Sequence, residues 1–259
     1  MFVAGIDAGQ STIKVAIISD DKVLSSIVLQ AGGESTEVMA ELAFKQAVEE
    51  ADISTNDVKF IMATGSGRKY ITFAQQQSPE LACVAKQIYA LFPTAASVID
   101  IGAQKCLALN LNDGNPLDFA MNDKCAAGSG IFLEKVASML RLNIDEIGPV
   151  SLQTQEELEV TNTCAVFAES DIISHVHAKK QIADILMAVF NGLALRAYAI
   201  MTRIGINEDV VMIGGVARNV GVVKALEGQI GTKLLIPENP QIVGAVGAAL
   251  MAKQVMEGE

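Results

Sequence analysis

The chain has 259 residues, of which 51% are hydrophobic, and its formal net charge at pH 7 is -11. This length suits one large domain or two moderate ones, and the hydrophobic content is sufficient for a packed aliphatic core. The excess of acidic over basic residues argues against nucleic acid or an anionic membrane as the main partner.

Two further features bound the class of protein. The longest apolar stretch, Ile185 to Met201, contains Asn191 and Arg196, and the N-terminus lacks the basic segment of a signal peptide, so we expect no membrane span. The four cysteines have no close pairing and are too few for a disulfide framework. We therefore expect a globular, cytoplasmic protein whose cysteines remain thiols.

The N-terminal elements predict a β-meander that begins with a phosphate loop. Apolar runs predict strands at Phe2 to Asp7, Ile13 to Ile18 and Val23 to Leu29. The turn between the first two strands offers N–H groups and hydroxyls to phosphate oxygens. Its residues are Gly9, Gln10, Ser11 and Thr12. Asp7 can hold a hydrated Mg²⁺ ion and Lys14 adds positive charge, although an ordinary hairpin turn is the alternative.

The same pattern occurs again in the middle of the chain. Asp100 and Gly102 follow an apolar strand as Asp7 and Gly9 do, and a returning strand and an Asp-Gly turn come next. We therefore interpret the chain as a tandem duplication of one α/β unit. Two such units facing each other would place both aspartates on the walls of one cleft, around a nucleoside triphosphate and its metal.

A third loop contains Gly214 and Gly215, between a strand that starts at Val210 and a helix. Paired glycines suit close backbone approach to a ribose and base, and a plain strand-to-helix turn is the alternative. The sequence Thr64-Gly-Ser-Gly-Arg68 also follows a predicted strand. We interpret it as a simple loop, with the alternative that Arg68 lines a dimer interface or the nucleotide cleft.

Apolar periodicity predicts the helices and the strands between them. The helices are Ser35 to Ala51, a helix with Ser78 as N-cap and Pro79 at its first position, Ile131 to Leu140, Asp184 to Arg203, and a small-residue helix at Gly244 to Ala252. The additional strands are Val58 to Ala63 and Ser97 to Ile101. We expect the chain to cross between domains near Pro93 and Pro240, with residues 1–95 and 241–259 in one domain and 96–240 in the other.

Two cysteines stand where predicted helices begin. Cys125 precedes small residues and an apolar helical run, and Cys164 follows polar N-cap candidates in a second such stretch. A helix N-terminus favours the thiolate form. A metal or iron–sulfur centre usually takes four thiolates, so two per chain suggest a two-fold dimer that completes the set. Small buried hydrophobes are the alternative interpretation of both side chains.

The two histidines and the other two cysteines are weaker candidates for metal ligands. His175 and His177 are two residues apart, so they face different directions on a helix and cannot chelate one metal together. We expect them to be solvated or to face a partner. Cys83 and Cys106 lie within helix and strand patterns, so we expect buried thiols.

Five segments together resemble the activator ATPases of 2-hydroxyacyl-CoA dehydratases, over essentially the whole chain. They are Gly5-Ile-Asp-Ala-Gly-Gln-Ser-Thr12, Ile99-Asp-Ile-Gly-Ala-Gln104, Met121-Asn-Asp-Lys-Cys-Ala-Ala-Gly-Ser-Gly130, Thr163-Cys-Ala-Val-Phe-Ala-Glu-Ser170 and Gly214-Gly-Val-Ala-Arg-Asn219. The two cysteine motifs are the specific part. The family also includes ATPase subunits of benzoyl-CoA reductases and reductases of double-cubane cluster proteins, within the acetate and sugar kinase, heat-shock cognate and actin superfamily.

The resemblance implies an α/β fold with two actin-like domains of duplicated βββαβα type around a nucleotide cleft. It also implies ATP or ADP with Mg²⁺ in each chain, and a homodimer with one [4Fe-4S] cluster ligated by Cys125 and Cys164 of each copy. The implied partners are an upstream ferredoxin or flavodoxin and a downstream metalloprotein that accepts the electron.

The resemblance further assigns roles at the nucleotide. Asp7 and Asp100 would organise Mg²⁺ and water, and Gln104 would position the attacking water. Gly9, Ser11 and Thr12 would meet phosphates, while Gly214 and Gly215 would border adenosine. The remaining expected cofactor-binding positions are Gln10, Lys14, Gly102, Ala103, Gly128, Ser129, Gly130, Glu134, Val216, Asn219 and Gln241.

The chain departs from the family pattern at two places. Dehydratase activators commonly read Ile-Gly-Gly-Gln-Asp where this chain has Ile101-Gly-Ala-Gln-Lys105, so a cation replaces a carboxylate. Cys83-Val84 stands where a Cys-His pair is frequent. The acceptor therefore need not be a hydroxyacyl-CoA dehydratase.

The function predicted from the sequence is ATP-dependent delivery of a low-potential electron to a partner protein. Two alternatives use the same residues differently. A small-molecule kinase of the same superfamily would need the nucleotide site but no paired helix-start thiols. A zinc-bridged, actin-like scaffold dimer would use the four thiolates for Zn²⁺.

Overall fold

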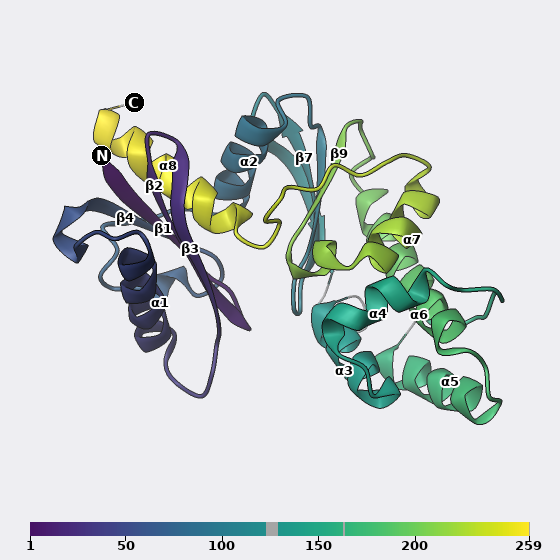
Figure 1. The fold of residues 1–259 in the computed structure, drawn as a ribbon. Coiled ribbons are helices and arrows are strands. Elements are labelled where there is room, and N and C mark those ends of the chain that lie inside the picture. Colours follow the sequence, from purple (N-terminus) through teal and green to yellow (C-terminus); the bar gives the residue numbers. More distant parts are fainter. Residues whose placement is uncertain (123–128, 163, 259) are drawn as a thin grey trace. The chain divides into compact units, whose positions relative to one another are not determined.

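The computed structural model describes residues 1–122, 129–162 and 164–258 (Figure 1). The chain divides into two compact units. The first unit comprises Met1–Ala95, Leu111–Leu117 and Gln241–Glu259, and the second comprises Ala96–Asn110 and Asp118–Pro240. The segment Leu111–Leu117 differs from the expected division. It packs in the first unit, where a Cβ added to Gly114 would lie 2.7 Å from the Tyr89 ring.

The first unit contains a five-stranded sheet of order β3-β2-β1-β4-β5. The strands are β1 (Phe2–Ala8), β2 (Thr12–Ser19), β3 (Lys22–Gln30), β4 (Val58–Thr64) and β5 (Gln76–Gln77). The first three are antiparallel, which confirms the predicted meander, whereas β1 pairs with β4 in parallel. This arrangement puts the carboxyl ends of β1 and β4 at the same edge of the sheet.

Strand β1 is buried on both faces because its side chains alternate between two helical layers. Ala4 and Ile6 pack with α1 (Thr36–Glu50). Val3 packs with α8 (Val243–Glu257) and with Cys83 of α2 (Glu80–Leu91). The predicted small-residue helix therefore does pack tightly on a neighbour, since α8 lies directly against β1 and α2 (Figure 1).

A second sheet, of order β8-β7-β6-β9, belongs to the second unit except for the end of β7 and the start of β8, which lie in the Leu111–Leu117 segment of the first. Its strands are β6 (Ser97–Ile101), β7 (Cys106–Asn112), β8 (Asn115–Met121) and β9 (Val210–Ile213). The helices of the second unit are α3 (Gly130–Leu140), α4 (Ile144–Ser151), α5 (Ala165–His177), α6 (Ile182–Met201) and α7 (Val220–Ile230). Strand β6 is antiparallel to β7 and parallel to β9. The pairing of β1 with β2 and β4 is thus repeated, as the duplicated sequence predicts.

Helix α6 is long and apolar enough to cross a membrane by length and composition, but 67% of its most apolar window is buried inside the protein. Phe190 on this helix is fully buried and belongs to the main core of the second unit. We therefore describe α6 as a core helix.

One predicted element boundary needs correction, and one helix was not predicted. Helix α2 begins at Glu80, because Pro79 occupies the N-cap with extended backbone (φ -57°, ψ 139°) instead of the first helical position. Helix α4 is not among the predicted helices, since Gly148 and Pro149 interrupt its apolar pattern. It forms because Asn143 and Glu146 make a capping box and Ile147 is buried.

The contact between β1 and α8 gives a stability prediction. A Cβ added at Gly5 would lie 2.0 Å from the Ala245 carbonyl oxygen and 2.4 Å from the Ala249 nitrogen. Gly5→Ala should therefore lower the free energy of unfolding by about 2–3 kcal/mol, measured by urea titration. In Gly228→Ala, the control on α7, the new Cβ meets no atom within 4 Å, and stability should rise by about 0.5–1 kcal/mol. A Gly5→Ala protein as stable as the wild type would contradict the packing.

The predicted burial of two thiols is confirmed: Cys83 is 0% exposed and Cys106 is 1% exposed. Burial raises the pKa of Cys83, and it raises the pKa of Cys106 to about 12. Only the thiolate reacts as a nucleophile. Both groups are therefore inert at neutral pH.

Thiol labelling tests this conclusion. At pH 8 a thiol whose pKa is about 12 is ionised in roughly one molecule in ten thousand. An alkylating reagent at this pH should leave Cys83 and Cys106 unmodified in the native protein and label both after denaturation, as read by peptide mass spectrometry. Labelling of Cys106 in the native protein as fast as that of the half-buried Cys164 would contradict the burial of the Cys106 thiol.

Candidate functional site

The first candidate turn is built around Asp7, which is 6% exposed near the end of β1. Lys14 lies directly opposite Asp7 on the neighbouring strand β2, and the Lys14 Nζ is 3.2 Å from Asp7 Oδ2. The other oxygen, Oδ1, is buried and has no hydrogen-bond partner among the described residues. A buried carboxylate oxygen without a donor is costly unless a ligand or ion completes it.

Two glycines leave the space around this carboxylate. A Cβ at Gly65, which follows β4 and has φ +86°, would lie 2.4 Å from Asp7 Oδ1. A Cβ at Gly244 would lie 3.3 Å from Asp7 Oδ2. Gly65 therefore needs both its positive φ and its missing side chain. The segment expected to be a simple loop is thus part of the Asp7 site.

The predicted phosphate turn is closed by its own backbone, because the Gly9 N–H donates to the Thr12 carbonyl at 3.0 Å. Gln10 is exposed, and Ser11 is half-buried. Since the Gly9 amide is already used, any phosphate contact from this turn must come from the other residues.

The second candidate turn repeats this construction in the second unit. Asp100 is 7% exposed near the end of β6, and its Oδ2 lies 2.6 Å from the Lys105 Nζ. The Gly102 N–H donates to the Lys105 carbonyl at 2.8 Å, as Gly9 does to Thr12. A Cβ at Gly214, which follows β9 with φ +87°, would lie 2.5 Å from Asp100 Oδ1.

Helix α3 starts directly on this second turn. The Gly130 N–H donates to the Gly102 carbonyl at 2.9 Å, and the Ile131 N–H donates to the Ala103 carbonyl at 3.0 Å. A Cβ at Gly130 would also meet Val216 at 3.5 Å. The structure thus brings Gly102, Ala103, Gly130 and Val216 together. It also assigns the Gly130 amide to a carbonyl partner, so this amide is not turned toward a charged group.

The other predicted nucleotide residues have varied surroundings. Asn219 caps α7, since its Oδ1 accepts hydrogen bonds from the Gly221 and Val222 N–H groups at 3.0 and 3.1 Å. Gln104 and Glu134 are exposed, and Ser129 is buried at the N-cap of α3. Gly215 and Gln241 are half-buried.

Of the two predicted ligand cysteines, one can be described. Cys164 is a free, half-buried thiol at the N-cap of α5, where its carbonyl accepts from the Ala168 N–H at 3.0 Å. Its side chain makes no capping hydrogen bond. Cys125 and Gly128 lie outside the described residues. Within the part of the chain that is described, no group of three or more His, Cys, Asp or Glu side chains is placed to hold a metal ion.

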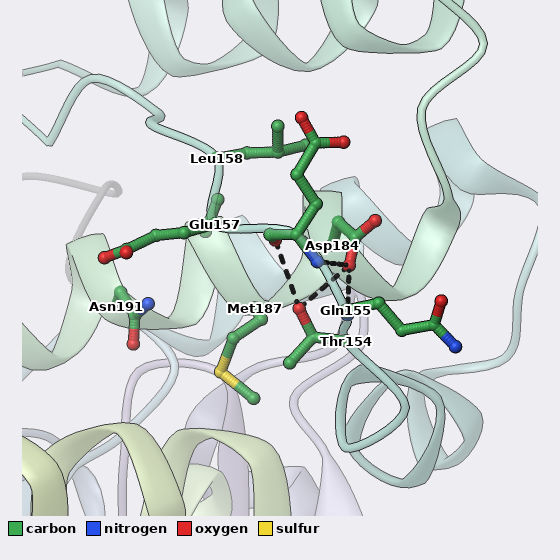
Figure 2. A pocket seen from close by; sticks show the side chains of 9 residues that line it. Thr154, Gln155, Glu157, Leu158, Asp184, Met187 and Asn191 are labelled. Carbon is green, nitrogen blue, oxygen red and sulfur yellow. Dashed lines mark hydrogen bonds between the residues drawn. The ribbon is translucent and has the colours of Figure 1, made fainter.

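Sequence patterns do not indicate the side chains that hold the segment before Cys164. Asp171 Oδ2 accepts from the Thr161 N–H at 2.8 Å, and His175 Nε2 donates to the Glu159 carbonyl at 2.9 Å. The buried Asp184 accepts three hydrogen bonds from Thr154, Gln155 and Glu156, beside a pocket shown in Figure 2. An Asp-x-x-x-His spacing on α5 is the only available signal, because the partners of Asp171 and His175 are backbone groups.

Sequence comparison relates the chain to ATPases along nearly its full length. The model of the BadF/BadG/BcrA/BcrD ATPase family matches residues 4–252. The activator of lactoyl-CoA dehydratase from Anaerotignum propionicum is 39% identical, over 99% of this chain and 99% of its own length. The 2-hydroxyisocaproyl-CoA dehydratase activator from Clostridioides difficile is 37% identical, over 97% and 95%. A benzoyl-CoA reductase subunit from Thauera aromatica is 30% identical, over 96% and 91%.

Solved structures agree with this relationship. The activator of the 2-hydroxyisocaproyl-CoA dehydratase from Clostridium difficile, with bound ADPNP, matches with a TM-score of 0.94 at 35% identity and covers 100% of this chain and 98% of its own. A ROK family glucokinase from Streptomyces griseus, at 14% identity and a TM-score of 0.60 over 98% and 100%, shares the fold alone. The resemblance inferred from the five motifs is confirmed. The chain has an actin-like ATPase fold and belongs to the BadF/BadG/BcrA/BcrD ATPase family.

Proposed function

We propose that this ATPase couples ATP hydrolysis to delivery of a low-potential electron to a partner metalloprotein. Its relatives are named as activators of dehydratases or as a benzoyl-CoA reductase subunit. The acceptor would be a 2-hydroxyacyl-CoA dehydratase, a benzoyl-CoA reductase-like enzyme or a double-cubane cluster protein, and a cytoplasmic ferredoxin or flavodoxin would supply the electron. The observation that carries the proposal is the direct hydrogen bonding of α3 to the Asp100 turn.

The nucleotide role rests on the two carboxylate turns. Asp7 Oδ1 is a buried oxygen that lacks a described hydrogen-bond donor, which fits a water-coordinated Mg²⁺ ion. In this proposal Asp7 and Asp100 organise the ion and water, and Gln104 positions the attacking water. The phosphates lie on Ser11, Thr12 and the neighbouring amides, and adenosine lies along Gly214 and Gly215.

The cluster role rests on the cysteines. Cys164 suits a cluster ligand because it is a free, half-buried side chain at the N-cap of α5 that makes no capping hydrogen bond. Cys125 and Cys164 of two copies would hold one [4Fe-4S] cluster, which supplies one-electron transfer at low potential when bound.

A homodimer is supported by the exposed face of α5. Val166, Phe167 and Ile173 on this helix are 65%, 62% and 49% exposed. Apolar side chains gathered on one helix mark an interaction surface. Because the same helix begins at Cys164, a second copy seated here would bring its own cysteines close.

Among the described residues, a series of contacts runs from the Asp100 turn to α5, which starts at Cys164. The Gly102 and Ala103 carbonyls accept from the first N–H groups of α3, and Lys135 of α3 forms an ion pair with Glu169 of α5. In this proposal a shift of the Asp100 turn on hydrolysis moves α3, which follows Cys125 in the sequence, and through the ion pair it also moves α5, whose N-cap is Cys164. Such movement changes the solvent access and hydrogen bonding of the thiolates, which are the factors that set reduction potential.

Iron analysis tests the cluster. Anaerobically purified wild-type protein should be brown and contain iron and sulfide, while Cys125→Ser and Cys164→Ser should lose both, because each variant removes two of four ligands from a dimer. Cys83→Ser, which changes a buried thiol, is the control and should keep its iron. Iron retained in both ligand variants would refute the assignment, and zinc in place of iron would favour a scaffold.

Asp7→Asn tests the nucleotide site. Loss of a carboxylate that organises Mg²⁺ should lower the ATPase kcat more than about 100-fold, since such contacts are worth several kcal/mol. Asp20→Asn makes the same chemical change on an exposed turn and should leave kcat unaltered. Steady-state phosphate release measures both. Equal rates in Asp7→Asn and the wild type would remove Asp7 from the mechanism.

A further inference from the structure

The segment from 154 to 162, here called the strap, links α4 to the N-cap residue Cys164. It folds back along α5 and is held there at successive points. Thr161 contacts Asp171, Glu159 contacts His175, and Glu156 pairs with Lys180 just beyond the helix. As the residue numbers on the α5 side of these contacts rise, the residue numbers on the strap side fall. The strap and the helix therefore run antiparallel.

The spacing of these contacts fits both chains. Thr161 and Glu159 are two residues apart, and extended backbone covers about 6.6 Å in that distance. Asp171 and His175 are four residues apart, and a helix rises about 6 Å over four residues. Both hydrogen bonds can therefore form at the same time, with the strap in a single alignment along α5. Leu158 and Val160 alternate with the bonded positions and pack against the core of the second unit.

The far end of the strap is fixed more firmly. Asp184 is 2% exposed, and its Oδ1 accepts from the Thr154 hydroxyl at 2.9 Å and from two successive N–H groups at 2.7 and 3.0 Å (Figure 2). Hydrogen bonds from the Glu156 and Gln155 backbone, together with the other contacts, lower the pKa of Asp184. The strap thus has one fixed end at Asp184 and one end that leads into Cys164.

We propose that Asp171 and His175 are positioning residues for Cys164: by fixing the strap along α5, they set the direction of the thiolate. This inference rests on the proposed cluster role of Cys164. Asp171 is the decisive residue, because Thr161 is the last bonded strap position before Cys164. If this bond is lost, no described hydrogen bond holds the strap residues after Glu159 on the helix.

The chemistry of Asp171 suits this task. Hydrogen bonds from the Thr161 side chain and backbone lower its pKa, so it is a charged acceptor at neutral pH. Charged acceptors make shorter and stronger hydrogen bonds than neutral ones. Hydrogen bonds outside the ligand shell can orient metal ligands and tune their affinity, and here the bond would act on Cys164 through Thr161 and the chain between them.

The test uses two measurements on the full-length protein. In cluster-free protein, the alkylation rate of Cys164 is read by peptide mass spectrometry, and trypsin separates it from Cys125 by cleaving at Arg141 and other basic residues. In anaerobically purified protein, the rate of iron loss to an added chelator is followed by absorbance. The first measurement does not need a bound cluster.

Asp171→Ala should raise both rates roughly tenfold, the effect of losing one charge-assisted hydrogen bond. Asp171→Asn retains an acceptor oxygen and should stay within about threefold of the wild type. Asp145→Ala, which removes an 82% exposed carboxylate elsewhere in the second unit, is the control and should change neither rate. A loss of global stability alone would raise the alkylation of the buried Cys83 and Cys106 together with that of Cys164, whereas the positioning role predicts a change at Cys164 only.

The outcomes separate the two proposals. Unchanged rates in Asp171→Ala, with iron present in the wild type, overturn the positioning role and leave the proposed function intact. Faster alkylation in Asp171→Ala, with no iron in the wild type, supports the positioning of Cys164 and refutes the cluster. If Asp171→Ala does not fold, His175→Ala carries the test, with an expected rise of about threefold in alkylation and no change as the contrary result.

Discussion

A buried carboxylate at the end of a strand, paired with one lysine and walled by a glycine at positive φ, is the constraint on which both units depend. Asp7 and Asp100 are each less than a tenth exposed, and each is paired with an ammonium group. Neither arrangement tolerates a side chain at the glycine that follows the adjacent parallel strand, where a Cβ would lie 2.4 or 2.5 Å from the carboxylate oxygen. Charge and space are thus fixed together at the proposed nucleotide turns.

The two units reach this geometry from different positions. Lys14 lies two residues beyond Thr12, whereas Lys105 itself occupies the position equivalent to Thr12 and closes the turn with its carbonyl. The cation that replaces the usual carboxylate at 105 is therefore part of an internal ion pair with Asp100. This gives the departure from the family pattern a physical role. The same turn also contacts α3, whose first two N–H groups donate to the Gly102 and Ala103 carbonyls.

The features that the sequence predicts are those that repeat or have a period. The Asp-x-Gly turns, the meander, the long helices and the burial of Cys83 and Cys106 all follow from such patterns. Side chains that bond to distant backbone leave no comparable signal, so the roles of Asp171, His175 and Asp184 could not be predicted. Gly65 was missed because it resembles Gly214 only in following a parallel strand and in having a positive φ. The residues around the two glycines in the sequence are not alike. Strand β8 was missed although Leu117, Phe119 and Met121 alternate along it, because Pro116 lies within the run; the strand tolerates this proline because it is at the edge of its sheet.

The turn at Asp100, helix α3, helix α5 and the strap are connected by hydrogen bonds and an ion pair, and we propose that this system couples the nucleotide to Cys164. The central claim is that two copies of the chain hold one inorganic cluster between them. Native mass spectrometry of anaerobically purified protein tests this most directly. The account predicts the mass of two chains plus one [4Fe-4S] unit. A species with the mass of one chain, free of iron and sulfide, would contradict it.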